Sequence, residues 1–186
     1  MIINNVKLVL ENEVVSGSLE VQNGEIRAFA ESQSRLPEAM DGEGGWLLPG
    51  LIELHTDNLD KFFTPRPKVD WPAHSAMSSH DALMVASGIT TVLDAVAIGD
   101  VRDGGDRLEN LEKMINAIEE TQKRGVNRAE HRLHLRCELP HHTTLPLFEK
   151  LVQREPVTLV ALMDHSPGQR QFANREKYRE YYQGKY

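Results

Sequence analysis

The triplet His55-Thr56-Asp57 carries an imidazole and a carboxylate two residues apart, directly after a largely apolar stretch at residues 51–54. On an extended segment, residues two apart point to the same face. One imidazole nitrogen and one carboxylate oxygen can then bind the same divalent ion. Alone the triplet is weak evidence, but its position after an apolar strand introduced by Pro49-Gly50 favours a metal site.

Two later apolar runs also end in potential ligands. Glu138 lies near the end of residues 131–139, and His165 follows residues 157–163 after Asp164. In parallel βα architectures, functional residues lie at the carboxyl ends of strands. Taken alone, Glu138 is more typical of a surface or ion-paired carboxylate. His165 could bind metal, bind phosphate or orient water, and a structural hydrogen bond at the strand end is an equally good interpretation.

Basic side chains flank these candidate ligands. Lys61, Arg66 and Lys68 follow the first strand, and Gln169 and Arg170 follow His165. Such groups can hold a phosphate, although solvated loop charges are an equally good interpretation. We favour Arg66, because it lies between two prolines that restrict the backbone on either side.

The other histidines carry less weight. His131 and His134 are three residues apart on a predicted strand, so they point to opposite faces. We expect His80 to be structural. Cys137 has no base nearby in the sequence and is interpreted as a packed, inert thiol.

Two regions position these residues. Residues 1–48 predict a small β domain, in which Asn23-Gly24 between alternating runs indicates a tight hairpin with positive φ at both turn positions. Residues 32–45 are polar and Gly-rich and predict a loop. Residues 49–186 alternate between strand and helix, which predicts βαβ units and a parallel sheet.

The expected elements of residues 49–186 follow from periodicity. A buried strand is expected within residues 47–55, with further strands at 89–96, 131–139 and 157–163. Helices are expected at about 79–87 with Ser78 as N-cap, at 107–124, at 145–154 and in the tail 171–186.

Composition narrows the class of protein. The chain has 186 residues, of which 40% are hydrophobic and 26% charged, as in soluble globular proteins. We find no run of roughly 20 apolar residues and no signal peptide, and we expect a cytoplasmic protein with no membrane partner. The single Cys137 excludes an internal disulfide. The net charge of −7 argues against nucleic-acid binding.

Residues 49–57, Pro-Gly-Leu-Ile-Glu-Leu-His-Thr-Asp, resemble the amidohydrolase superfamily signature, an apolar strand after Pro-Gly that ends in His-x-His. Asp57 replaces the second histidine, a ligand change that divalent ions accept. Residues 58–61, 64–67, 69–72, 88–94 and 163–169 resemble one narrower family, the α-D-ribose 1-methylphosphonate 5-triphosphate diphosphatases of the bacterial carbon–phosphorus lyase pathway. The resemblance spans essentially the whole chain and corresponds to the amino-terminal half of such proteins.

This resemblance implies a distorted (β/α)₈ barrel and a β domain assembled from both chain ends. It also implies a divalent metal, zinc first, with manganese, iron or nickel as alternatives. Residues 136–140 resemble the Leu-Glu-Gly-Pro of sugar-phosphate deacetylases in the superfamily, where the Glu is a ligand. Glu138 is thereby implied as the third ligand beside His55 and Asp57.

The expected reaction is hydrolysis of a phosphorylated sugar phosphonate, a 5-triphosphate, to the 5-phosphate and pyrophosphate. Metal-activated water attacks the α-phosphorus. The expected catalytic residues are Asp57, Glu138 and His165. The expected substrate-binding residues are Lys61, Arg66, His165, Gln169 and Arg170.

Length leaves alternatives open. A complete barrel takes about 250 residues, so the expected fold is a partial TIM-like barrel of about four βα units behind the small β domain. The chain could instead be an inactive truncated fragment, or a half-barrel that binds a partner, either a second copy or a missing carboxyl-terminal half. Another amidohydrolase, such as a deacetylase or cyclic amidase, is a further alternative, against which residues 64–72 argue.

Overall fold

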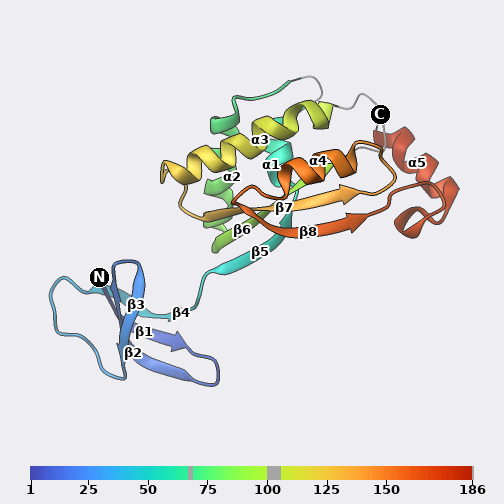
Figure 1. Cartoon of the computed structure of the whole chain (residues 1–186). Coiled ribbons are helices and arrows are strands. Elements are labelled where there is room, and N and C mark those ends of the chain that lie inside the picture. Colours follow the sequence, from blue (N-terminus) through green and yellow to red (C-terminus); the bar gives the residue numbers. More distant parts are fainter. Residues whose placement is uncertain (67–68, 100–105, 186) are drawn as a thin grey trace. The chain divides into compact units, whose positions relative to one another are not determined.

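The computed structural model describes residues 1–66, 69–99 and 106–185 (Figure 1). The chain divides into two compact units, Met1–Pro49 and Gly50–Tyr186. No helix within the described ranges combines the length and apolar character needed to cross a membrane.

The first unit is a four-stranded sheet. Its strands are β1 (Ile2–Val9), β2 (Val14–Gln22), β3 (Glu25–Ala30) and β4 (Met40–Leu47), in the order β3-β2-β1-β4. The hairpin prediction is confirmed, because Asn23 and Gly24 join β2 to β3 with φ of 54° and 82°. Val6, Leu8, Val15 and Leu19 form the small core.

The loop predicted at residues 32–45 is wrong in its second part. Residues from Met40 onward form β4, which pairs in parallel with β1. The register shifts between Asn4 and Val6, and Glu43 and Gly44 have φ of 54° and 73°. Glycine has low strand propensity and marks bulges, so composition alone hides this strand.

The second unit is built on a curled, four-stranded half-barrel sheet. Its strands are β5 (Leu51–Thr56), β6 (Ile89–Ile98), β7 (Glu130–Glu138) and β8 (Val157–Met163), all parallel and in this order. Helices α1 (Asn58–Phe63), α2 (Ala73–Ala86), α3 (Asp106–Lys123) and α4 (Thr144–Leu151) pack on one face of the sheet (Figure 1). The 3₁₀ helix η1 (Arg170–Phe172) and α5 (Arg175–Lys185) follow β8. The prediction of a partial barrel of about four βα units, preceded in the sequence by a small β domain, is confirmed.

We call the two faces of this sheet the helix face and the open face. Alternate residues of β7, Leu133, Leu135 and Cys137, belong to the buried core that the sheet forms with the helices. Because side chains alternate along a strand, the residues between them point to the open face. The core also contains the following buried residues of β6 and α3: Val96, Ile98, Leu111, Met114, Ile115 and Ile118.

The predicted burial of β5 is wrong. Leu51, Ile52 and Leu54 are 60%, 63% and 59% exposed, because β5 is an edge strand that pairs with β6 alone. A strand looks buried in sequence when it is apolar, but burial requires neighbours on both sides. The glycine that precedes it has a steric cause, since a Cβ on Gly50 would lie 2.0 Å from Oγ1 of Thr90.

Helix α2 begins six residues before the predicted start at residue 79. Pro72 precedes its first residue, Ala73, and Ser78 lies inside the helix. Proline near a helix start is favourable, because its missing N–H has no helical partner there. The capping role expected of Ser78 is therefore wrong.

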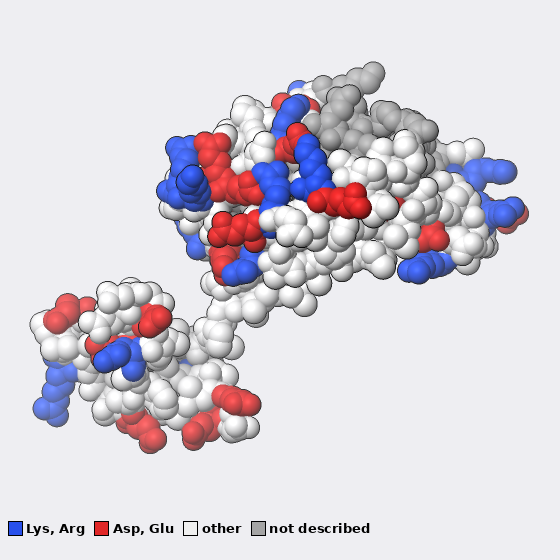
Figure 2. Space-filling view, in the orientation of Figure 1, with Lys and Arg blue, Asp and Glu red and all other residues white. Residues whose placement is uncertain are grey.

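The surface of α3, of α4 and of the residues just after α4 carries paired charges. Lys150 forms an ion pair with Glu112, and Arg154 forms one with Glu119. Figure 2 shows Lys and Arg beside Asp and Glu over these elements rather than a continuous basic field. Exposed pairs contribute little stability each, but they neutralise these cations.

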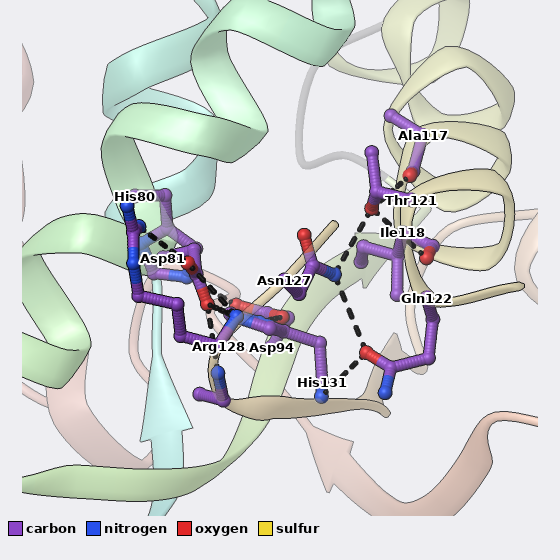
Figure 3. Close-up of polar contacts among 11 residues, drawn as sticks. His80, Asp81, Asp94, Ala117, Ile118, Thr121, Gln122, Asn127, Arg128 and His131 are labelled. Atoms are coloured by element: carbon purple, nitrogen blue, oxygen red, sulfur yellow. Dashed lines mark hydrogen bonds and ion pairs between the residues drawn. The ribbon is translucent and has the colours of Figure 1, made fainter. Parts of the chain in front are cut away.

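A buried polar group ties α2 to the sheet (Figure 3). Asp94 of β6 accepts from two histidines: its Oδ1 lies 2.6 Å from Nε2 of His80, and its Oδ2 lies 2.7 Å from Nδ1 of His131. Nε2 of His131 lies 3.3 Å from Oδ1 of Asp81. All four side chains are at most 1% exposed. We call this set the Asp94 cluster.

Hydrogen bonding fixes the charges of the Asp94 cluster. Asp81 accepts from the backbone N–H groups of Arg128 and Ala129, at 3.0 and 2.9 Å. Both nitrogens of His131 face carboxylates that only accept, so His131 carries two protons and a positive charge. Burial opposes this charge, but the bonds and charges of Asp94 and Asp81 raise the pKa of His131. Burial likewise opposes ionisation of Asp94, but the two histidines lower its pKa.

Replacing Asp94 should destabilise the second unit strongly. In Asp94→Asn the amide cannot accept from both histidines, and the buried His131 loses its counter-charge. We expect the free energy of unfolding in urea to fall by about 3 kcal/mol. Glu130→Gln, which removes a half-exposed pair with Arg132, is the control and should cost less than about 1 kcal/mol. Equal effects of the two substitutions would contradict this role of Asp94.

The Asp94 cluster also predicts how stability depends on pH. The pKa of His131 is raised above 6.5, so its contribution is complete below pH 6.5 and is lost as pH rises through the raised value. The pKa values of Asp81 and Asp94 are lowered below 3.8, so their contributions are present above pH 3.8 and are lost on further acidification. Urea unfolding across pH should give maximal stability between these limits. Stability that increases steadily above pH 6.5 would refute the charged state of His131.

Candidate metal centre at the carboxyl ends of the strands

The carboxyl ends of β5, β7 and β8 meet at one edge of the sheet, because all strands are parallel. His55 lies on β5, whereas Asp57 lies just beyond it, at the residue before α1. The expectation that both lie on one extended strand is therefore wrong for Asp57, whose φ and ψ are −90° and 10°. Even so, Nε2 of His55 and Oδ2 of Asp57 are 3.8 Å apart.

Arg136 of β7 fixes the orientation of Asp57. Its Nη1 donates to Oδ1 of Asp57 at 2.5 Å, and its Nε donates to Sδ of Met163 at 3.2 Å. The guanidinium thus occupies one carboxylate oxygen and leaves Oδ2 facing His55. We did not predict a role for Arg136, although its position two residues before Glu138 places both on one strand face.

His134 completes what we call the His55 site, made of His55, Asp57, His134 and Arg136. The rings of His134 and His55 lie edge to face, with centroids 5.0 Å apart. His134 is 4% exposed, and burial together with the neighbouring His55 and Arg136 lowers its pKa. His131 lies in the Asp94 cluster on the helix face, so the prediction that the two histidines point to opposite faces is confirmed.

Glu138 is held by His165 at the same edge. Its Oε1 accepts from the backbone N–H of His165 at 2.7 Å, and its Oε2 lies 2.5 Å from Nδ1 of the same residue. The Thr144 hydroxyl donates to the Glu138 carbonyl at 2.5 Å, which anchors the end of β7. Nδ1 of His165 therefore serves as the donor to Glu138, and its Nε2 is left as an acceptor.

The predicted substrate-binding groups follow β5 and β8. Lys61 lies on α1, with Nζ 3.5 Å from Oδ1 of Asn58, and Arg66 forms an isolated β-bridge with Val69. Lys68 lies outside the described residues. Gln169 precedes η1, and Arg170 begins it with φ of 38°. These groups therefore belong to the segments that follow β5 and β8 at the carboxyl edge.

The Asp94 cluster contains a set that could hold a metal ion. Within the described residues, His80, Asp94 and His131 are the one group of three His, Cys or acidic side chains whose ligand atoms all lie within 4.8 Å. However, two ligands of one zinc ion lie about 3.4 Å apart in tetrahedral geometry. The contacts of 2.6 and 2.7 Å are those of direct hydrogen bonds. As it stands, direct hydrogen bonds join these three side chains, and Nδ1 of His80 is buried without a hydrogen-bond partner.

The His55 site fits an ion better on two counts. The separation of 3.8 Å between His55 and Asp57 is close to that expected for two ligands of one ion. Both side chains are also almost half exposed, at 44% and 43%, so an ion can reach them. Glu138 is not gathered with these two within 4.8 Å, judged over the residues that the structure describes.

Surface shape does not identify the site. A small pocket is lined by Asp57 and Arg136, but also by the core residues Val96 and Met114, and His55 is not among its lining residues. A larger cavity of about 660 Å³ lies at the opposite, amino ends of β7 and β8, where Gln122, Glu130 and Glu155 line it. None of the predicted site residues lines that cavity, so size alone does not identify the site.

No known protein-family profile matches this chain. Among solved structures, a D-hydantoinase matches 86% of this chain at 18% identity with a TM-score of 0.50. A mutant of the atrazine chlorohydrolase TrzN from Arthrobacter aurescens TC1, complexed with zinc and atraton, matches 92% at 11% identity with a TM-score of 0.51. At these identities the likeness concerns the fold. The chain spans 32% of the first protein and 54% of the second.

Imidazole ¹⁵N NMR should distinguish the two candidate metal sites without any mutation. One equivalent of zinc added to metal-free protein should shift the ring nitrogens of His55, because that ring is accessible and faces Asp57. The nitrogens of His80 and His131 should keep the signals of hydrogen-bonded rings. The reverse pattern would transfer the metal site to the Asp94 cluster.

Proposed function

We propose that this chain supplies the amino-terminal strands of a metal-dependent hydrolase of the amidohydrolase type. His55 and Asp57 would hold a divalent ion, zinc first, at the carboxyl edge of the sheet. The observation that carries this proposal is the separation of 3.8 Å between Nε2 of His55 and Oδ2 of Asp57, with the second carboxylate oxygen fixed by Arg136. The parallel half-barrel supports it, since such folds place their chemistry at this edge.

Bound at this site, the ion supplies Lewis-acid polarisation and lowers the pKa of water. Arg136 keeps Asp57 in position as a ligand. His165 accepts a proton at Nε2, because its Nδ1 donates to Glu138. Glu138 then stabilises the imidazolium that forms, as a carboxylate does behind any histidine base. Direct ligation by Glu138, which the superfamily resemblance implies, would require it to release both hydrogen bonds to His165.

We propose as substrate a phosphorylated sugar phosphonate, hydrolysed at a phosphoanhydride to the 5-phosphate and pyrophosphate. The support is the family resemblance of residues 58–61, 64–67, 69–72, 88–94 and 163–169 together with the basic groups at the carboxyl edge. Lys61, Arg66 and Arg170 would hold phosphate oxygens and offset their charge in the transition state.

The structures that share this fold are longer than this chain, so we propose that further strands complete the barrel and its ligand set. They would come from a carboxyl-terminal half or from a second copy. Both β5 and β8 are edge strands of the described sheet, with exposed apolar side chains at Leu54 and Leu162. Such edges favour pairing with further strands.

Asp57→Ala should lower zinc-dependent pyrophosphate release from the ribose 5-triphosphate by about 100-fold or more, because an ion ligand is lost. Glu149→Ala, at an exposed carboxylate of α4, is the control and should keep wild-type activity. Circular dichroism should show both variants folded. Undiminished release by Asp57→Ala would reject the site. Ring opening of hydantoin in place of pyrophosphate release would redirect the assignment to a cyclic amidase.

A further inference from the structure

A pocket of about 390 Å³, which we call the α5 pocket, is formed by α5 and the segment that follows β8. It is lined by Pro167, Arg175, Tyr178, Arg179, Tyr182 and Gln183. All of these side chains except that of Pro167 carry a hydrogen-bond donor, and none is a carboxylate. By contrast, the larger cavity at the amino ends of β7 and β8 is lined by Glu119, Glu130 and Glu155. The α5 pocket therefore suits a ligand with negative charge and several acceptor oxygens.

The two arginines of the α5 pocket have no carboxylate partner. Every arginine between residues 124 and 154 pairs with a carboxylate. Arg175 and Arg179, in contrast, form no ion pair within the described residues. They are four residues apart on α5, so they lie on one face of the helix, where like charges disfavour each other. An anion bound between them would remove this repulsion.

The turn after β8 gives Arg175 room beside the backbone. Gly168 has φ of 88°, and a Cβ on it would lie 3.3 Å from Nε of Arg175. The backbone N–H of Gly168 donates to the carbonyl of Phe172 at 2.9 Å, which closes the segment between β8 and α5. The guanidinium of Arg175 is thus placed against this turn, and Pro167 of the same turn lines the pocket.

Phe172 connects the α5 pocket to the proposed active site. Its ring is 8% exposed, and its centroid lies 5.1 Å from that of Tyr178 and 5.8 Å from that of Tyr182, both of which line the pocket. The same ring lies 6.0 Å from that of His165, the proposed proton acceptor. One buried aromatic side chain therefore contacts both the wall of the pocket and His165.

We propose that the α5 pocket binds the two terminal phosphates of the proposed substrate, which leave as pyrophosphate. This inference rests on the proposed function and deepens it, because it assigns the leaving group to residues beyond Lys61, Arg66 and Arg170. The planar forks of Arg175 and Arg179 donate N–H groups to the phosphate oxygens, and their charges offset the charge that develops on the leaving group.

The step balances with water as the co-reactant. The water oxygen bonds to the α-phosphorus, and His165 takes a proton from that water. The bond between the α-phosphorus and the bridging oxygen breaks, and the bridging oxygen leaves with the electron pair as part of pyrophosphate. No side chain of the α5 pocket exchanges a proton or forms a covalent bond in this step.

The test measures binding of pyrophosphate to the metal-free full chain by isothermal titration calorimetry. Arg175→Gln and Arg179→Gln should each weaken binding at least ~10-fold, because charge-assisted hydrogen bonds are lost. Arg179→Lys keeps the charge but loses the fork, so its affinity should be intermediate. Lys177→Gln is the matched control. It makes the same change of charge on the same helix, at an exposed residue that does not line the pocket, and should bind nearly as wild type.

Arginine ¹⁵N NMR of the unmodified protein provides a readout that does not depend on the folding of any variant. Pyrophosphate should shift the Nε–H signals of Arg175 and Arg179. The signal of Arg132, which is paired with Glu130, should stay in place.

The outcomes separate the claims. No binding of pyrophosphate by wild type, or unchanged binding by both Arg175→Gln and Arg179→Gln, overturns the α5 pocket as the subsite. If these variants hydrolyse the ribose 5-triphosphate with the wild-type KM while Asp57→Ala is inactive, the proposed function stands and the inference fails. If wild type releases no pyrophosphate but binds it through the two arginines, the proposed function fails and the pocket stands as a pyrophosphate site. Weaker binding and a higher KM in both variants, with Lys177→Gln unchanged, support both claims.

Discussion

The second unit depends on one buried interaction, the acceptance by Asp94 of hydrogen bonds from His80 and His131. Apolar packing holds the helices on the sheet but is non-directional. Asp94 and Asp81 add direction, because each carboxylate must face its donors or remain uncompensated in a dry interior. They thereby fix the rotation of α2 and the register of β6 against β7. That register decides which residues of β7 reach the carboxyl edge.

The two faces of β7 carry residues with different roles: those on the helix face stabilise the fold, and those on the open face belong to the candidate site. The helix face carries His131, whose protons are fully used within the Asp94 cluster. The open face carries His134, Arg136 and, at the strand end, Glu138, which interact with groups following β5 and β8. Two histidines three residues apart thus lie on different faces and have different hydrogen-bond partners. The distances between the ligand atoms, compared with those expected around one ion, distinguish a hydrogen-bonded cluster from an ion site. The number of histidines does not.

Much of the fold could be predicted from sequence because it rests on local patterns. Asn23-Gly24 specifies its turn, and the alternation of apolar strands and amphipathic helices specifies the parallel sheet. Two features could not be predicted because they depend on distant residues. The Gly-rich strand β4 exists only because β1 pairs with it, and β5 is exposed only because it has one neighbour.

The candidate site was predictable in part for the same reason. His55, Asp57, Glu138 and His165 stand out because they end predicted strands, and the structure places them at one edge. The sequence carries no sign that Arg136 binds Asp57 or that Glu138 binds His165, since those contacts span 79 and 27 residues. The buried pairing of Asp81 with residues 128, 129 and 131 was hidden for the same reason.

The central claim is that the ion site lies on the open face, beside His55 and Asp57. Anomalous diffraction at the zinc edge, from crystals of the zinc-loaded chain, tests it most directly. The account predicts one strong peak between Nε2 of His55 and Oδ2 of Asp57, with no peak among His80, Asp94 and His131. A peak inside the Asp94 cluster, or none in fully loaded crystals, would contradict it.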